Sequence, residues 1–343
     1  MTTPATGDRL RHQPGTLGAA SLRRQPSKSL ALARLRRGVR RQWLLFVLLT
    51  VVVSIAGIAI DLTGGSPILS SAAFWLPLAG AVALAATLAR EISRNTITSL
   101  SSFGKHRGYA ILGAAPELTP RTLRQLPPDK RNPLGCLALL PASPFATAFR
   151  DLQATVSKDA VVAFTSSVPN EGSTTAALCT AISASQQGQS VVVIDCDLRR
   201  RSLTRALGFD PDEGLLDACA DPEAWHNFVG EEDETGVHFI PAARGAGAWR
   251  HLGSMPGFKT LLTRLRRHYD LIVLDCPPAL ASAEGAVIAG LAEKTVLVAG
   301  WDRTPLNAVR RTMGMLQRRP GAKTGVYVNR VPPEYRFGRL RGG

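Results

Sequence analysis

The sequence is poor in the residue patterns that mark metal centres and disulfide frameworks. Its five cysteines form no Cys-X-X-Cys pair, and its six histidines show no His-Glu-X-X-His spacing. Neither residue type therefore indicates a metal site. Because the cysteines lie mostly inside apolar runs, we expect buried free thiols in a reducing compartment. No repeat with a fixed period is evident, so a repeat array is not expected.

Acidic residues are scarce in the N-terminal part of the chain. Residues 1–41 contain ten Lys or Arg and one acid, residues 90–150 contain nine and three, and residues 151–343 contain 22 and 21. The net charge of +15 therefore comes from the two segments on either side of residues 42–89, and residues 151–343 are almost neutral. We therefore expect no nucleic-acid binding. The length of 343 residues suits about two domains.

Charge is absent from two long apolar runs, residues 42–60 and 62–89. Each can cross a hydrocarbon layer, which needs about 20 residues. We predict a transmembrane hairpin over residues 42–90, with spans at about 42–60 and 71–89. The alternative, two buried helices of a soluble protein, fits poorly with the dense arginines beside these runs.

The basic flanks predict the orientation of this hairpin. Basic segments remain cytoplasmic, so both termini should lie in the cytoplasm. The connection between the spans is too short for a folded extracytoplasmic domain, which a partner would have to supply. Residues 1–41 are rich in Pro, Ser and Gly and read as a disordered tail. Its basic residues would be drawn to anionic lipid by about 1 kcal/mol each.

Residues 91–142 are rich in proline and read as a cytoplasmic linker, whereas residues 143–343 show regular α/β patterning. Apolar, β-rich runs alternate there with helical stretches, which predicts an α/β fold with a buried, mainly parallel sheet and flanking helices. In one such helix Thr304 is the expected N-cap and Pro305 the first helical residue. The expected strands are residues 160–165, 191–196, 237–240, 271–275, 295–299 and 325–329.

A phosphate-binding loop is expected after the first of these strands. Such a loop cradles phosphates with backbone N–H groups, a Lys that reaches the β and γ oxygens, and a Ser or Thr that holds magnesium. Gly172 and Thr174 fit this spacing, but Ser173 occupies the Lys position. Asn170 stands where a further glycine is expected. The loop therefore lacks its usual cation.

Acidic residues follow two other strands. Asp195 and Asp197 stand two apart at the end of one strand, and Asp275 closes an apolar run before two prolines. Carboxylates in this position can hold magnesium or accept a hydroxyl proton. A lone acid after a strand more commonly caps a helix, and all three aspartates could be structural groups of that kind.

These motifs together resemble the bacterial tyrosine kinases, the P-loop cytoplasmic domains of polysaccharide co-polymerases in capsule and exopolysaccharide export. The resemblance runs from about residue 108 to residue 333. It is carried by AILGAAPEL, PASPFATAFRDLQATV, SSVPNEGSTT, VVVIDCDLRR, FDPDEGLLDACAD, VHFIPAA, FKTLLTRLRRHYDLIVLDCPP and GVYVNRVPP.

The resemblance implies a P-loop NTPase-like fold and a location in the bacterial inner membrane. It also implies ATP and magnesium as cofactors and assigns roles to particular residues. Asp197 would be the candidate catalytic base, and Tyr335 the candidate phosphorylation site. It also implies a polysaccharide-export membrane partner with an extracytoplasmic domain, and self-association. The implied nucleotide-binding residues are Asn170, Glu171, Gly172, Ser173, Thr174 and Thr175, and the implied magnesium ligands are Thr174, Asp195, Asp197 and Asp275.

The chain departs from the family pattern in several places. Gly172 and Asp195 are 23 residues apart, as expected in the family, so no gap hides the missing Lys. Thr147, Arg150 and Gln153 stand where the family's self-association helix has Glu, Arg and Arg. The tyrosine-rich tail is reduced to Tyr335, and no large coiled-coil segment separates the two predicted spans.

Three functions remain open at this point. The first is a membrane-anchored pseudokinase, a regulatory subunit of exopolysaccharide synthesis and export. The second is a working tyrosine autokinase with an atypical loop. The third is a membrane-tethered relative of the partitioning ATPases, against which the kinase-like segments PASPFATAFRDL and LGAAP argue.

Overall fold

The computed structural model divides into two units, residues 1–94 and 95–343. It describes residues 47, 48, 50–52, 54, 55, 77–83, 96, 97, 109–156, 160–232, 235–245, 251–318 and 323–333.

The first unit is described only in two helical stretches, within residues 47–55 and at residues 77–83. None of the helices in the described residues has the length and apolar character needed to cross a bilayer. The predicted tail at residues 1–41 and most of the two predicted spans lie outside the described residues. The hairpin therefore stays a prediction.

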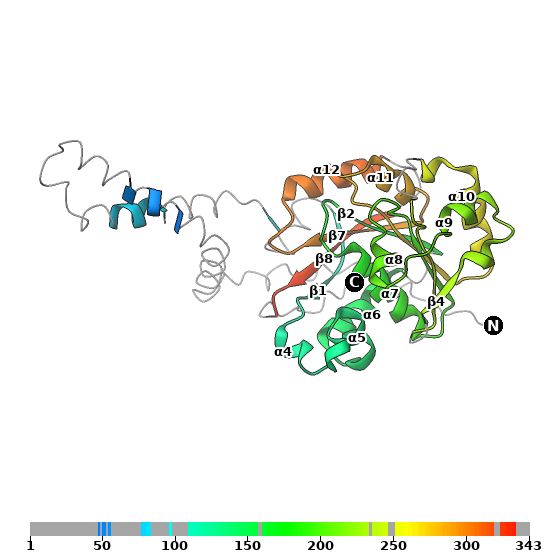
Figure 1. The fold of residues 1–343 in the computed structure, drawn as a ribbon, viewed down its shortest axis with the longest axis horizontal. Coiled ribbons are helices and arrows are strands. Elements are labelled where there is room, and N and C mark those ends of the chain that lie inside the picture. Colours follow the sequence, from blue (N-terminus) through cyan, green and yellow to red (C-terminus); the bar gives the residue numbers. More distant parts are fainter. Residues whose placement is uncertain are drawn as a thin grey trace, which may run out of the picture. The chain divides into compact units, whose positions relative to one another are not determined.

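The second unit is built on an eight-stranded sheet, which lies between two layers of helices (Figure 1). The strand order is β1-β8-β7-β2-β6-β3-β5-β4. All neighbouring strands are parallel except β4 and β5. The strands are β1 (Ala110–Pro116), β2 (Val161–Ser166), β3 (Val191–Asp195), β4 (Gly230–Glu232), β5 (Val237–Ile240), β6 (Leu271–Asp275), β7 (Lys294–Gly300) and β8 (Lys323–Val331). This confirms the mainly parallel α/β sheet.

Alternate residues of the buried strands feed two separate hydrophobic cores. Val161 and Ala163 of β2 face one core, and Val162 and Phe164 face the other. The first core is covered by α9 (Leu215–Ala220), α10 (Pro256–Leu265), α11 (Ala283–Ala289) and α12 (Leu306–Gln317). The second is covered by α5 (Pro133–Leu139), α6 (Pro144–Val156), α7 (Ser173–Ser185) and α8 (Ser202–Ala206). Both faces of the sheet are therefore apolar, as its continuous hydrophobic strands require.

Part of the predicted linker belongs to this folded unit. Within residues 91–142, β1 pairs with β8, and α4 (Pro120–Leu123), the 3-10 helix η1 (Pro128–Lys130) and α5 follow it. Several of the prolines that suggested a linker begin helices. Pro120, Pro128 and Pro133 each occupy the first position of a helix, where the missing N–H group costs nothing. The folded unit therefore includes residues well before residue 143, where the sequence placed its start.

Two expected local features are corrected by the structure. The α12 helix begins at Leu306 with Pro305 as its N-cap, so Thr304 does not cap it. Gln153 is only 2% exposed and exchanges hydrogen bonds with Gln187 and Gln189 at 2.7 Å each. Its side chain is therefore committed to the interior, and of the three residues at the family's self-association positions it is the one that cannot face a partner.

Candidate nucleotide site

The central strands bring the predicted motifs together at one edge of the sheet. β6 lies between β2 and β3, and Asp275 is in register with Phe164 on one side and Asp195 on the other. The loop after β2 and the acids after β3 and β6 therefore meet at the carboxyl ends of adjacent parallel strands. In open α/β sheets, ligands bind in this position.

The loop after β2 has the backbone of a phosphate cradle. Asn170 has φ +66° and Gly172 has φ +94°, so the chain turns twice through the left-handed region before α7 begins at Ser173. Gly172 is the N-cap and offers no side chain to the helix end. The Ala176 amide donates to the Gly172 carbonyl at 2.9 Å, which leaves the preceding helical amides without a partner inside the helix. This end of α7 is suited to an anion.

Glu171 stabilises the loop from inside. Its carboxylate accepts hydrogen bonds from the amides of Ser167 at 2.8 Å and Val168 at 3.1 Å, and from the Thr304 hydroxyl. Burial raises the pKa of Glu171, and these hydrogen bonds partly offset the rise. The side chain is 3% exposed and is turned toward the loop's own backbone. Glu171 therefore shapes the predicted site, and its carboxylate is directed away from any ligand bound on the outside of the loop.

The end of β8 supports the other side of the loop. The Asn329 side chain donates to the Glu171 carbonyl at 3.0 Å, and Arg330 Nη1 donates to the Asn170 carbonyl at 3.2 Å. Asn329 also lies over Gly172, where an added Cβ would come within 2.3 Å of Nδ2. Two consecutive residues of one strand thus hold two consecutive carbonyls of the loop.

Asp195 is held by the start of α8. Its Oδ2 accepts hydrogen bonds from the Thr204 amide at 2.9 Å and the Thr204 hydroxyl at 2.6 Å, and its Oδ1 accepts one from the Asp197 amide at 3.2 Å. Burial raises the pKa of Asp195 to about 6, against the opposing effect of the Thr204 hydrogen bonds. Asp195 is therefore a structural acceptor whose pKa lies above that of an ordinary aspartate.

Asp197 accepts the Arg200 amide at 3.1 Å through Oδ1. Burial raises its pKa, while the Arg200 amide and the charges of Arg200 and Arg199 act in the opposite direction. A carboxylate whose pKa is raised by burial is better suited to accept a proton than an ordinary surface aspartate. The role of Asp197 as a base stays a prediction.

Asp275 is the least satisfied acid of the three. It is 1% exposed, and apart from the nearby Thr174 hydroxyl its carboxylate oxygens have no hydrogen-bond partner among the described residues. Burial and the nearby charge of Asp195 raise its pKa well above the ordinary range, and the Thr174 hydroxyl lowers it in part. Buried polar atoms normally have partners. A buried carboxylate with so few polar contacts, beside the Thr174 hydroxyl, therefore fits a site for a cation.

The chemistry of these side chains fits magnesium bound together with a nucleotide. Magnesium prefers oxygen ligands and is usually held by one or two carboxylates, water and substrate phosphates. Within the described ranges, no three His, Cys, Asp or Glu side chains are arranged to hold a metal by themselves. The Thr174 hydroxyl and the Asp275 carboxylate would therefore need phosphate oxygens and water to complete the shell, with Asp195 and Asp197 behind them.

The arginines that follow β3 do not replace the missing lysine. Arg201 donates to the Ala242 carbonyl at 2.9 Å and forms an ion pair with Asp210 at 2.6 Å. Arg199 and Arg200 are exposed. Lys158, which the sequence places before β2, lies outside the described residues. Arg330 is the arginine whose guanidinium touches the loop.

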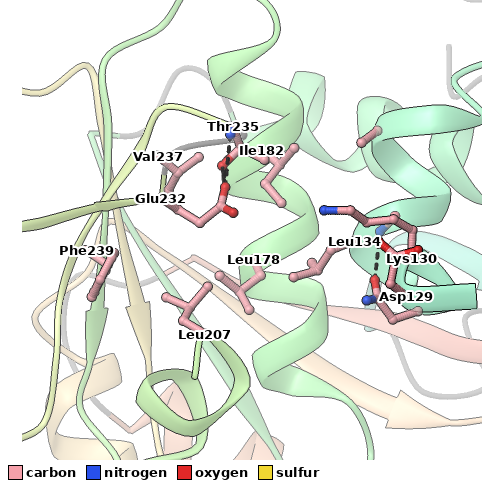
Figure 2. A pocket seen from close by; sticks show the side chains of 13 residues that line it. Asp129, Lys130, Leu134, Leu178, Ile182, Leu207, Glu232, Thr235, Val237 and Phe239 are labelled. Atoms are coloured by element: carbon pink, nitrogen blue, oxygen red, sulfur yellow. Dashed lines mark hydrogen bonds between the residues drawn. The ribbon is translucent and has the colours of Figure 1, made fainter. Parts of the chain in front are cut away.

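A pocket of about 170 Å³ lies elsewhere, between α7, α5 and the β4–β5 hairpin (Figure 2). Leu178 and Ile182 of α7 and Leu134 of α5 form apolar walls, and the Lys130 amino group extends toward the space between them. Neither the loop residues nor the three aspartates line it. This pocket is separate from the candidate nucleotide site.

Gly172 should be the most sensitive glycine of the loop. Gly172→Ala is expected to lower the free energy of unfolding by about 2–4 kcal/mol, because it combines a left-handed φ with a clash against Asn329. Gly188→Ala is the matched control, since Gly188 has φ +81° but open space around a Cβ, and should cost about 1 kcal/mol. Chemical denaturation of the two variants tests this. Equal losses would contradict a packed contact between Gly172 and Asn329.

Comparison with known proteins identifies relatives of this chain. A family model described as an AAA domain matches residues 161–299. One relative is EpsB of Ralstonia solanacearum, a protein provisionally named as a tyrosine-protein kinase. It is 28% identical over 275 residues, which cover 76% of this chain and 37% of EpsB. The succinoglycan biosynthesis transport protein ExoP of Rhizobium meliloti is 28% identical over 180 residues, covering 50% of this chain and 23% of ExoP.

The solved structures agree in fold. The kinase domain of the Escherichia coli tyrosine kinase ETK superposes with a TM-score of 0.62 at 20% identity, covering 72% of this chain and all of that domain. The chain is a relative of the bacterial tyrosine kinases. It spans about a third or less of the length of the two curated relatives. The resemblance stated from the sequence motifs is confirmed at this level.

The kinase-like domain places most of the predicted site residues at one sheet edge. Asn170 to Thr175 form the loop and the first turn of α7, and the three aspartates lie on the neighbouring strand ends. Tyr335 lies outside the described residues and stays a prediction. Sequence reasoning missed Thr304, Asn329 and Arg330 as neighbours of the loop. The only available signal was that Asn329 and Arg330 follow an apolar strand in the same sheet.

Proposed function

We propose that this protein binds a magnesium–nucleotide complex at the loop after β2 and transfers phosphate slowly or not at all. In this proposal it is a regulatory subunit of exopolysaccharide or capsule synthesis and export, with ATP and magnesium as its ligands. The observation that carries the proposal is the buried Asp275 carboxylate beside Thr174, in a site where Ser173 stands in place of Lys.

Each residue of the site would have a separate role in binding the nucleotide and magnesium. The amides at the start of α7 would donate hydrogen bonds to the phosphate oxygens, and magnesium, when bound, would neutralise phosphate charge. Thr174 and Asp275 hold the metal, and Asp195 keeps α8 against the strand ends through Thr204. Asp197 is placed to receive a hydroxyl proton. The missing element is a positioned cation on the transferring phosphate, which is worth about 100-fold to 1000-fold in comparable sites.

The proposed location is the bacterial inner membrane. The support is the sequence alone: two uncharged runs flanked by arginines, which would form two spans with both termini in the cytoplasm. A partner with an extracytoplasmic domain would complete the machinery, and the basic residues 1–41 would bind anionic lipid. The name of ExoP, a succinoglycan biosynthesis transport protein, supports a role in polysaccharide synthesis or export. Homo-oligomers are compatible with this proposal.

Calorimetry of the full chain in detergent tests nucleotide binding. Mg-ATP should bind to the natural chain, and Asp275→Ala should weaken the binding at least tenfold through loss of a metal ligand. ATP with excess EDTA should bind more weakly than Mg-ATP. A natural chain that binds no Mg-ATP would overturn the nucleotide-binding part of the proposal. Purification from native membranes that recovers no polysaccharide-export component would overturn the assignment to export.

A working tyrosine autokinase is the second candidate. The observation that favours it is the retention of all three strand-end aspartates together with Thr174. Incubation of the natural chain with Mg-ATP followed by detection of phosphotyrosine separates the two. Phosphorylation of Tyr335 that is lost in Asp197→Asn would favour the active kinase over the regulatory subunit.

A further inference from the structure

Arg330 is the one residue at the candidate site that brings a guanidinium to the loop from another strand. Its Nη1 donates to the Asn170 carbonyl at 3.2 Å, and the side chain is half-buried. An arginine carries five donors in a planar fork that matches phosphate oxygens, and it stays charged at all ordinary pH values. Because one N–H group of the Arg330 guanidinium donates to the Asn170 carbonyl, its other N–H groups can donate to a ligand at the loop.

The backbone of Arg330 is held in an uncommon conformation. Its φ is +60°, in the left-handed region that costs a non-glycine residue about 1 kcal/mol. The Arg330 amide donates to Asn329 Oδ1 at 2.9 Å, and the Asn329 side chain in turn donates to the Glu171 carbonyl at 3.0 Å. Asn329 therefore stabilises the backbone of Arg330 and also contacts the loop. A strained residue maintained by its surroundings indicates a function for its side chain.

The loop itself supplies the reason for such a residue. Ser173 occupies the position of the Lys that would reach the phosphates, and Arg201 forms an ion pair with Asp210. Glu171 also brings a carboxylate into the loop, where it is bound by two loop amides. A phosphate group arriving at α7 therefore meets dipoles but no cation from the loop. Among the described residues, Arg330 has a guanidinium hydrogen-bonded to the loop, while Arg303, Glu117 and Glu171 are close enough to influence its pKa.

We propose that Arg330 binds the nucleotide's phosphates and supplies from β8 the positive charge that the loop lacks. This inference rests on the proposed nucleotide site. In it, Arg330 keeps its contact with Asn170 and places its remaining donors on phosphate oxygens. It thereby provides affinity, whereas fast phosphoryl transfer still requires a cation at the position of Ser173.

The test is a double-mutant cycle measured by calorimetry on the full chain with Mg-ATP. Arg330→Gln is expected to weaken binding at least tenfold in the natural loop and threefold or less in a Ser173→Lys background, where lysine supplies the charge. Arg330→Lys should retain part of the affinity. The matched control is Arg310→Gln, an exposed arginine on α12, which should change nothing.

A second ligand separates a phosphate contact from a contact with the base. Inorganic tripolyphosphate with magnesium should show the same loss in Arg330→Gln as Mg-ATP does. Equal losses in both loop backgrounds would mean that Arg330 only supports the loop structure, and a loss confined to ATP would place it at the base. Either result overturns the inference but leaves the proposed function standing. If the natural chain binds neither ligand, the proposed function itself fails.

Discussion

Ser173→Lys is expected to raise the rate of Mg-ATP-dependent phosphoryl transfer by about 100-fold or more. The reason is electrostatic, since the substitution places a cation where negative charge spreads in the transition state. Ser173 is half-buried at the first position of α7, and the aspartates and Thr174 are already in place. The measurement is the rate of phosphotyrosine formation by the full chain.

Ser173→Met is the matched control for this prediction. It adds a side chain of similar length without the charge, so any gain from filling space appears in both variants. The proposal requires a large gain for lysine and none for methionine. If lysine leaves the rate unchanged while calorimetry shows that the nucleotide binds, a defect other than the missing cation limits transfer.

Asp275→Asn is expected to stabilise the ligand-free protein and to weaken magnesium-dependent nucleotide binding at the same time. The substitution removes a buried carboxylate that, apart from the Thr174 hydroxyl, has no hydrogen-bond partner among the described residues and that has Asp195 nearby. We expect the free energy of unfolding at pH 8 to rise by about 1–3 kcal/mol. Affinity for Mg-ATP should fall at least tenfold, because an amide is a poorer magnesium ligand than a carboxylate.

The pH dependence of this effect has a definite sign. The pKa of Asp275 is raised in the folded protein, so the folded state keeps a proton that the unfolded state has released. Its contribution to stability is therefore present at low pH and is lost as the pH rises from about 4 through the folded pKa. Asp195, with a pKa of about 6, adds a loss in the same direction.

Denaturation of natural and Asp275→Asn proteins at several pH values measures this contribution. The difference in the free energy of unfolding should be small near pH 4 and should grow toward pH 8. Asp270→Asn is a surface control, because its pKa is lowered by hydrogen bonds from Ser190. That variant should lose stability, with the loss largest at neutral pH. A constant difference for Asp275→Asn across the pH range would contradict an uncompensated buried carboxylate.

The convergence of the aspartates was predictable because parallel strands bring their carboxyl ends to one edge. The sequence alone therefore indicated the site, because two apolar strands end at Asp195 and Asp275. β1 was missed because it is an edge strand whose residues are mostly half-buried and whose sequence, AILGAAP, lacks a continuous run of large apolar residues. β4 was missed because it has three residues, two of them acidic. Both lie at sheet margins, where the hydrophobic signal is weakest.

The loop's surroundings were harder to predict for a different reason. The inward turn of Glu171 and the contact between Arg330 and Asn170 join residues more than 100 positions apart through side-chain geometry. Hydrophobic periodicity carries no information on such contacts. The left-handed φ of Arg330 is equally invisible, because arginine is not a residue that favours this region. The sequence could therefore locate the loop but not the residues that support it.

The pairing of β1 with β8 joins the first strand of the domain to the loop after β2. At the end of β1 the Glu117 amide donates to the Val331 carbonyl at 2.7 Å, and Val331 directly follows Arg330. Upstream of β1 the chain is held to the same domain, because the Asp302 amide donates to the Ile97 carbonyl at 2.9 Å and Thr96 Oγ1 donates to Asp302 Oδ1 at 2.9 Å. β8 therefore supports both the first strand of the domain and the loop, so these two distant parts of the sequence share one support.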